Sequence, residues 1–145
     1  MTEPVDCIVL GRKLAEGFIP HWAANTELEG AEKFNTVHKV VFTKTLDSSI
    51  WENTILANGN IADEIDQLKK QDGKDIIAYG GAQFVSSLIK HDLINEYHLF
   101  INPAVLVNGM RIFNNVRESK KLFLVKACSF KCGIVVLHYI SVPAK

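Results

Sequence analysis

The chain of 145 residues has no excess of charge of either sign, because sixteen basic residues balance sixteen acidic ones. This balance gives no general attraction to nucleic acids or anionic membranes, so any anion site has to be local. Cysteine is also scarce: Cys7, Cys128 and Cys132 are odd in number and lack Cys-x-x-Cys spacing. Such a set argues against a disulfide framework or a cysteine zinc site and is typical of a reducing compartment.

Long apolar runs are missing as well. No run approaches the roughly 18 residues of a membrane-spanning helix, and the opening MTEPVDCIVL has neither the basic start nor the cleavage pattern of a signal peptide. The chain also has no repeats, linkers or low-complexity segments. With 48% hydrophobic residues it predicts one globular domain, which we expect in the cytoplasm with a small-molecule partner and no nucleic-acid or membrane partner.

Three short apolar runs lack polar alternation: CIVL (7–10), VVF (40–42) and IIAY (76–79). Such runs are typical of strands buried on both faces of a largely parallel sheet, whose faces helices must cover. The pattern then changes, because EYHLFI (96–101) alternates and two later runs flank a turn at 131–133. The sequence therefore predicts an α/β fold, with a mixed, mainly parallel sheet that ends in an antiparallel hairpin.

Three segments show the apolar spacing of helices. Residues 12–24 predict a helix that Gly17 and Pro20 should bend or end early. Residues 60–73 predict the clearest helix, with Asn60 as its N-terminal cap. A shorter helix is expected after the glycine pair at 80–81, ending near residue 90.

Ligands of open parallel sheets bind beyond the carboxyl ends of the strands, so the residues after each buried run are the first candidates. Three loops qualify, each with groups that suit a phosphate: Gly11, Arg12 and Lys13; Thr43, Lys44 and Thr45; and Gly80, Gly81, Ala82 and Gln83. Arg12 and Lys13 lie in the first turn of a helix, where the dipole disfavours cations by about 0.3–1 kcal/mol each. A bound anion would reverse that sign, and the alternative is that both side chains simply reach into solvent.

The other two loops are also open to two interpretations. The glycine pair removes two β-carbons and precedes a helix whose first N–H groups could face a pyrophosphate. It forms neither a G-x-G-x-x-G motif nor a P-loop, so a plain tight turn is the alternative. The 43–45 loop offers hydroxyls and one cation without a carboxylate, which suits a ribose 2′-phosphate, although it could also be an ordinary polar loop.

Other chemistry has little support in the sequence. The five histidines, at positions 21, 38, 91, 98 and 138, show no metal-ligand spacing, so we assign them no metal site and no role. No Ser-His-Asp or Cys-His arrangement stands out, which disfavours hydrolysis and leaves the catalytic residues unassigned.

Taken together, four stretches resemble the dihydrofolate reductase-like family, specifically the reductase domain of the bifunctional riboflavin-biosynthesis deaminase-reductase and its stand-alone relatives. They are CIVLGRKLAEGF, VVFTKTL, DIIAYGGAQFVSSLIKHDLINEYHLFINPAVLVNGMRIF and the closing hairpin, from about Val5 to about Tyr139. The order of the motifs carries the resemblance more than any one of them.

The resemblance implies an oxidoreductase that binds NADPH and transfers a hydride to a pterin-, pyrimidine- or ribitylamine-like heterocycle. Residues matching 11–13 would hold the pyrophosphate or the adenosine phosphate, and those matching 43–45 would border the adenosine. Residues matching Tyr79 to Gln83 would wrap the pyrophosphate and the nicotinamide ribose, and a homodimer is implied. The rivals are a nucleotide-binding module without turnover and a structural or interaction domain with a degenerate cleft.

Two features depart from the resembling family. Leu14 stands where a threonine commonly helps to hold the pyrophosphate. Relatives also begin with an additional strand and helix that supply much of the substrate pocket and any acidic proton donor, and that strand lies between those matching 75–79 and 96–101. We therefore expect these two strands to pair directly, a segment of a second chain to fill the slot, or the native product to be longer.

Overall fold

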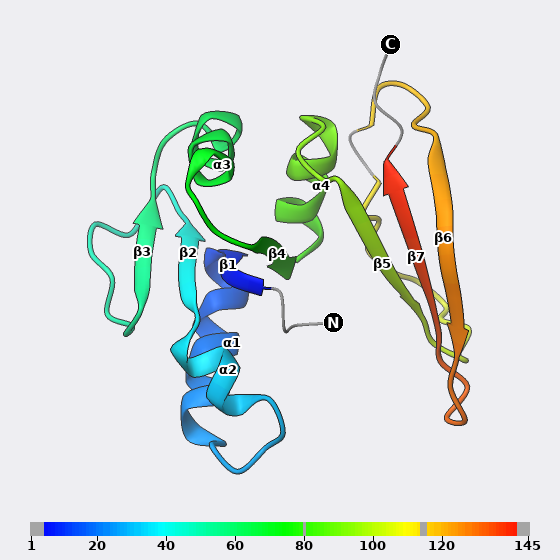
Figure 1. Ribbon diagram of the computed structural model, residues 1–145, viewed down its shortest axis with the longest axis horizontal. Helices are drawn as coiled ribbons and strands as arrows, with labels where there is room; N and C mark the ends of the chain where they lie inside the picture. Colours follow the sequence, from blue (N-terminus) through cyan, green and yellow to red (C-terminus); the bar gives the residue numbers. More distant parts are fainter. Residues whose placement is uncertain (1–4, 80, 114–115, 142–145) are drawn as a thin grey trace.

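The computed structural model describes residues 5–79, 81–113 and 116–141. Its elements, in chain order, are β1 (Val5–Gly11), α1 (Arg12–Ala24), α2 (Ala31–Thr36), β2 (His38–Phe42), β3 (Thr54–Ala57), α3 (Ile61–Lys70), β4 (Asp75–Tyr79), α4 (Ala82–Lys90), β5 (Glu96–Ile101), β6 (Leu122–Ser129) and β7 (Val135–Ser141). The strands form a parallel sheet in the order β3-β2-β1-β4 and an antiparallel sheet in the order β5-β7-β6 (Figure 1). Within the described ranges, no helix combines the length and the apolar character needed to cross a bilayer.

The parallel sheet forms the core of the molecule. Its central strand, β1, pairs with β2 on one side and β4 on the other, so residues 7–10 are buried on both faces. Helices α1 and α2 lie on one side of this sheet, and α3 and α4 lie on the other (Figure 1). The α/β architecture predicted from the three apolar runs is therefore confirmed, although β4 is only half-buried.

Helix α1 continues through Gly17 and Pro20 to its end at Ala24, so the helix predicted over residues 12–24 is confirmed. Of the two expected effects of Gly17 and Pro20, the early end is wrong and the bend stays a prediction. A proline inside a helix removes one backbone hydrogen bond and crowds the preceding turn. Pro20 itself faces solvent, whereas Ala15 and Ile19 are buried against the sheet. Packing of the apolar face holds the helix together across the proline.

Two elements, α2 and β3, are not predicted from the sequence. β3 has only four residues and pairs in parallel with β2, so its length is too short for a periodic signal. The neighbouring α3 begins as predicted, because the Asn60 side chain accepts hydrogen bonds from the N–H groups of Ala62 and Asp63 at 2.9 and 3.4 Å.

The antiparallel ending is also confirmed. β6 and β7 form a hairpin, and β5 joins the other side of β7. Gly133 closes the hairpin with φ of +95°, a left-handed conformation in which a side chain is strained. A β-carbon there would also lie 2.9 Å from Cγ of Pro103.

The two sheets do not share a pair of strands in the described part of the chain. β4 pairs with β1 and β5 pairs with β7, and α4 connects the two sheets (Figure 1). Direct pairing of residues 75–79 with 96–101, the first of the three expected arrangements, is therefore wrong. A strand from a second chain and a longer native product both stay predictions.

Candidate functional site

The carboxyl ends of β1, β2 and β4 meet at one edge of the parallel sheet. The strand register sets Gly11 beside Phe42 and Leu10 beside Tyr79. The three loops predicted from sequence therefore start at the same edge, although Gly80 lies outside the described residues.

Helices α1 and α4 both begin at this edge. In the described part of the chain, neither N-terminus has a side-chain cap or an acidic residue in its first turn. The start of α3 differs, because Asn60 caps it and Asp63 and Glu64 follow in its first turn. Uncapped N–H groups and the helix dipole favour negative charge, so the starts of α1 and α4 suit an anion and the start of α3 is already satisfied.

The two glycines that precede these helices have different roles. A β-carbon on Gly11 would lie 3.2 Å from Cβ of Phe84, so this glycine allows α4 to pack closely against the end of β1. Gly81 has ordinary dihedral angles, φ −65° and ψ 154°, and no atom within 4 Å of its β-carbon position. Neither the backbone nor the packing of this chain therefore requires a glycine at position 81, whereas the close approach of a ligand would.

The cations at this edge are partly neutralised. Arg12 donates from Nη1 to Oε1 of Glu16 at 2.9 Å, with the two side chains 34% and 47% exposed. An exposed i,i+4 pair of this kind is weak, so it can give way to a stronger anion. Lys13 and Lys44 are exposed and join none of the ion pairs found within the described ranges.

The 43–45 loop is organised by its first residue. Oγ1 of Thr43 is part of a buried side chain and accepts hydrogen bonds from the N–H groups of Thr45 and Leu46, both at 3.2 Å. Thr43 therefore fixes the shape of the loop, and Lys44 and Thr45 are the members that solvent or a ligand can reach.

Tyr79 belongs to an aromatic cluster rather than to an open surface. Its ring stacks on that of Phe18, with centroids 5.7 Å apart, and meets Phe34 edge to face. Burial raises the pKa of Tyr79, so its phenol stays protonated at neutral pH. After Gly81, Ala82 is half-buried and Gln83 is exposed.

Phe84 is a positioning residue that the sequence analysis missed. The centroid of its ring lies 5.3 Å from that of Phe42. Its β-carbon lies 3.2 Å from the place that a β-carbon on Gly11 would occupy. It therefore links α4 with the ends of β1 and β2. The available signal was its place as the first large apolar residue after the glycine pair.

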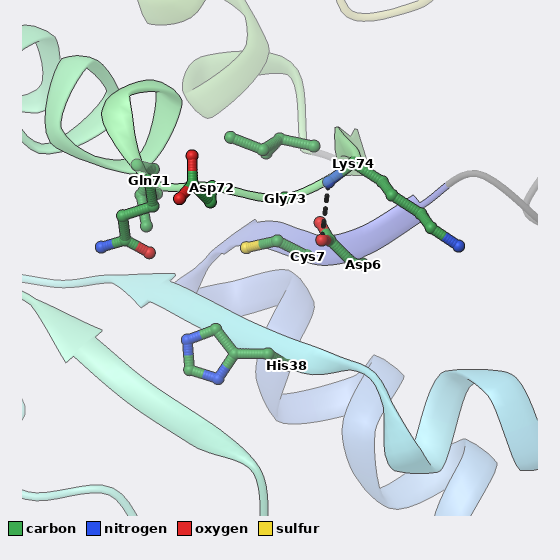
Figure 2. A pocket seen from close by; sticks show the side chains of 9 residues that line it. Asp6, Cys7, His38, Gln71, Asp72, Gly73 and Lys74 are labelled. Atoms are coloured by element: carbon green, nitrogen blue, oxygen red, sulfur yellow. Dashed lines mark hydrogen bonds between the residues drawn. The ribbon is translucent and has the colours of Figure 1, made fainter.

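A small hollow lies at the opposite, amino edge of the parallel sheet (Figure 2). It has a volume of about 90 Å³, and Asp6 in its wall accepts a 2.7 Å hydrogen bond from the N–H of Lys74. Burial, with a smaller contribution from Asp6, raises the pKa of the Cys7 thiol to about 11, which leaves it a poor nucleophile. A second hollow of about 270 Å³ lies between Tyr97 and Leu122. Neither contains the predicted site residues.

The sequence also matches a known family model, the RibD C-terminal domain, over residues 1–136. The chain belongs to the RibD C-terminal domain family. The resemblance of the sequence motifs to this reductase family is thereby confirmed, and the family places the chain among the riboflavin-pathway reductase folds.

Two curated relatives of this RibD C-terminal domain come from Bacillus subtilis strain 168. The uncharacterized protein YyaP is 35% identical over 139 residues, which are 93% of this chain and 73% of YyaP. The uncharacterized protein YwjB is 32% identical over 100 residues, covering 69% of this chain and 57% of YwjB.

Solved structures show the same fold at low identity. A candidate riboflavin biosynthesis protein from Shewanella sp. PV-4 matches with a TM-score of 0.79 and 18% identity, over 98% of this chain and 77% of that one. A diaminohydroxyphosphoribosylaminopyrimidine deaminase/5-amino-6-(5-phosphoribosylamino)uracil reductase from Thermotoga maritima matches with a TM-score of 0.66 and 12% identity, over 95% of this chain and 46% of that enzyme. The RibD C-terminal domain described here thus spans about half of the bifunctional protein.

Proposed function

We propose that this chain is an NADPH-dependent reductase that holds its cofactor at the carboxyl edge of the parallel sheet. NADPH would supply the hydride, and the acceptor would be a pterin-, pyrimidine- or ribitylamine-like heterocycle. The part of the protein is to bind the phosphates and orient the nicotinamide. Membership of a family of reductase folds supports the proposal, and the name of the Thermotoga maritima enzyme supports a pyrimidine as the acceptor. The wider choice of acceptors follows from the resemblance of the sequence motifs.

The observation that carries the proposal is the unused space at Gly81. The glycine stands at an uncapped helix start, with room for a side chain and no conformational need to lack one. A pyrophosphate lying against the backbone at this point would explain both features. The second uncapped helix start, at Arg12, opens on the same edge of the sheet and could share the phosphates.

Lys44, Arg12 and Lys13 carry the expected preference for NADPH over NADH. They supply positive charge at this edge, and none of the residues at 11–13, 43–45 or 81–83 is a carboxylate that would accept a 2′-hydroxyl. A charge-assisted contact is worth about 1.5–3 kcal/mol, so a preference of about tenfold or more is expected. Equal affinities for the two nucleotides would contradict the assignment of these loops.

A calorimetric titration with NADPH tests the site through Gly81→Val. The valine fits the free chain, so thermal stability should hold while NADPH affinity falls by at least about tenfold. Gly17→Val is the matched control, because Gly17 also has nothing within 4 Å of its β-carbon position but lies inside α1. If Gly81→Val lowers the melting temperature and leaves affinity unchanged, the glycine serves only the architecture.

The alternative is a nucleotide-binding module of the same fold without turnover. It is favoured by the lack of an acidic side chain among residues 11–13, 43–45 and 81–83, which leaves the proton donor for a reduction unassigned. Both functions predict NADPH binding. Oxidation of NADPH in the presence of reducible pyrimidines and pterins separates them, since the module would bind the cofactor and consume none.

The assembly that we propose is a cytoplasmic homodimer. Several large apolar side chains are exposed between β5 and β6, and two of them, Val105 and Val107, are fully exposed at 101% and 107%. A run of exposed apolar side chains along one segment is a candidate interface, since soluble monomers rarely expose large apolar patches. All three cysteines are free thiols, which fits a reducing compartment.

A further inference from the structure

The face of the antiparallel sheet that carries Glu96, His98 and His138 brings three potential metal ligands together. Glu96 and His98 are two residues apart on β5, so their side chains leave the same face of the strand. The register sets His98 directly opposite His138 on β7. One ligand atom from each of the three residues lies within 4.8 Å of the others.

The donor atoms already approach the spacing of a metal site. Oε2 of Glu96 lies 3.0 Å from Nε2 of His138 and 3.8 Å from Nε2 of His98. A tetrahedral zinc ion with bonds of about 2.0–2.1 Å holds its ligand atoms about 3.3–3.4 Å apart, a value between these two distances. The imidazole rings stack with centroids 4.2 Å apart, and small rotations of the two partly exposed side chains would bring their Nε2 atoms closer.

The cluster is open to solvent, so an ion can reach it without unfolding the sheet. The side chains of Glu96, His98 and His138 are 56%, 33% and 25% exposed. One cation stands nearby in the register, since Lys126 of β6 pairs with His138 from the other side. Its charge should weaken the binding of a metal ion without blocking the ligand atoms.

We propose that Glu96, His98 and His138 bind one divalent transition-metal ion of the zinc type. Two imidazoles and one carboxylate are ligands that suit such ions, and three protein ligands leave at least one coordination position for water or an outside group. The ion would join β5 to β7 near the end of the sheet where β5 begins. The site is separate from the proposed nucleotide site, because it lies on the other sheet.

Calorimetric titration of the metal-stripped chain with zinc chloride tests the proposal, with magnesium chloride as the comparison. We expect one zinc ion per chain and no heat of binding from magnesium, which prefers oxygen ligands. Glu96→Gln, His98→Gln and His138→Gln should each weaken zinc binding by at least about tenfold. Lys126→Gln should tighten it severalfold by removing a neighbouring positive charge.

Two control variants separate this site from other zinc-binding groups. His38→Gln removes an exposed histidine on the parallel sheet, and Cys132→Ser removes an exposed thiol at the hairpin turn. Both should bind zinc as the parent chain does. Loss of binding in either control, a stoichiometry of one zinc per two chains, or unchanged binding in all three ligand variants would overturn the proposal.

A measurement on the unaltered protein removes any dependence on how the variants fold. The imidazole NMR signals of His98 and His138 should shift together on addition of zinc and saturate at one equivalent, whereas those of His38 and His91 should stay in place. Shifts confined to His38 or His91 would overturn the site. NADPH is absent from both experiments, so failure of the metal site would leave the proposed function untouched.

Discussion

The two sheets of this chain differ in how far their strands are buried. In the parallel sheet, β1 is covered by strands on both edges and by helices on both faces, and Leu10 is 0% exposed. In the antiparallel sheet, β6 is exposed along most of its length, and Phe123 and Leu124 are 66% and 53% exposed. The parallel sheet, which has the packed core, carries the candidate nucleotide site. The antiparallel sheet carries the histidine cluster, and the exposed apolar residues Val105 and Val107 lie in the connection between its strands β5 and β6.

This difference in burial separates the sheet that contributes most to stability from the sheet whose exposed side chains can bind a partner. The two inner strands of the parallel sheet, β1 and β2, are buried among apolar side chains, so their carboxyl ends are a rigid base for loops that must hold a phosphate. The antiparallel sheet keeps its backbone pairing but buries little apolar area of its own. Its exposed side chains are therefore available to a second copy of the chain.

The largest expected contrast is in thiol reactivity. At pH 8, Cys7, whose pKa is raised to about 11, should hold roughly two hundred times less thiolate than an ordinary cysteine with a pKa of about 8.5. Cys132 lies exposed at the turn of the hairpin. Alkylation followed by mass spectrometry should therefore modify Cys132 at least about a hundredfold faster than Cys7. Similar rates would mean that the parallel sheet opens readily.

Truncation of one leucine in each sheet should give unequal losses of stability. Leu10→Ala removes a fully buried side chain from β1 and should lower the free energy of unfolding by about 2–5 kcal/mol. Leu124→Ala removes a half-exposed side chain from β6 and should cost less than about 1 kcal/mol. Urea unfolding followed by circular dichroism measures both, and equal losses would contradict the contrast between the sheets.

Association should depend on the exposed sheet and not on the parallel one. Val107→Lys places a charge at a fully exposed apolar position in the loop after β5. The dissociation constant of the proposed dimer, measured by sedimentation, should rise by at least about tenfold. Ile50→Lys makes the same change at an 84% exposed position near β3 and should have no effect. A dimer that survives the first change and dissociates with the second would relocate the interface.

The smallest expected effect concerns the pair at the start of α1. Glu16→Gln removes the exposed partner of Arg12 and should lower stability by only about 0.3–0.5 kcal/mol. The Arg12 guanidinium should then bind NADPH about twofold more tightly, because the Glu16 carboxylate no longer competes with the phosphate for it. Weaker NADPH binding in this variant would show that Glu16 positions Arg12 for the cofactor.

The candidate site could be predicted because each of its parts is local. The strand that ends at Leu10, the helix that starts at Arg12 and the glycines after Tyr79 are all contiguous in the sequence. Parallel strands then bring their carboxyl ends to one edge as a matter of topology. The internal roles of Gly11 and Thr43 were not predictable, since they depend on Phe84 and on loop hydrogen bonds that only the folded chain contains.

By itself, the sequence determined the α/β class, the buried strands, the capped helix at Asn60 and the family, because periodicity, caps and motif order are written along the chain. The tertiary structure alone decided that α1 crosses Pro20 intact, since that depends on what its apolar face packs against. It also decided that the strands form two sheets and that His98 meets His138. Residues that distant become neighbours through strand register, which arises from pairing between segments and leaves no spacing in the sequence.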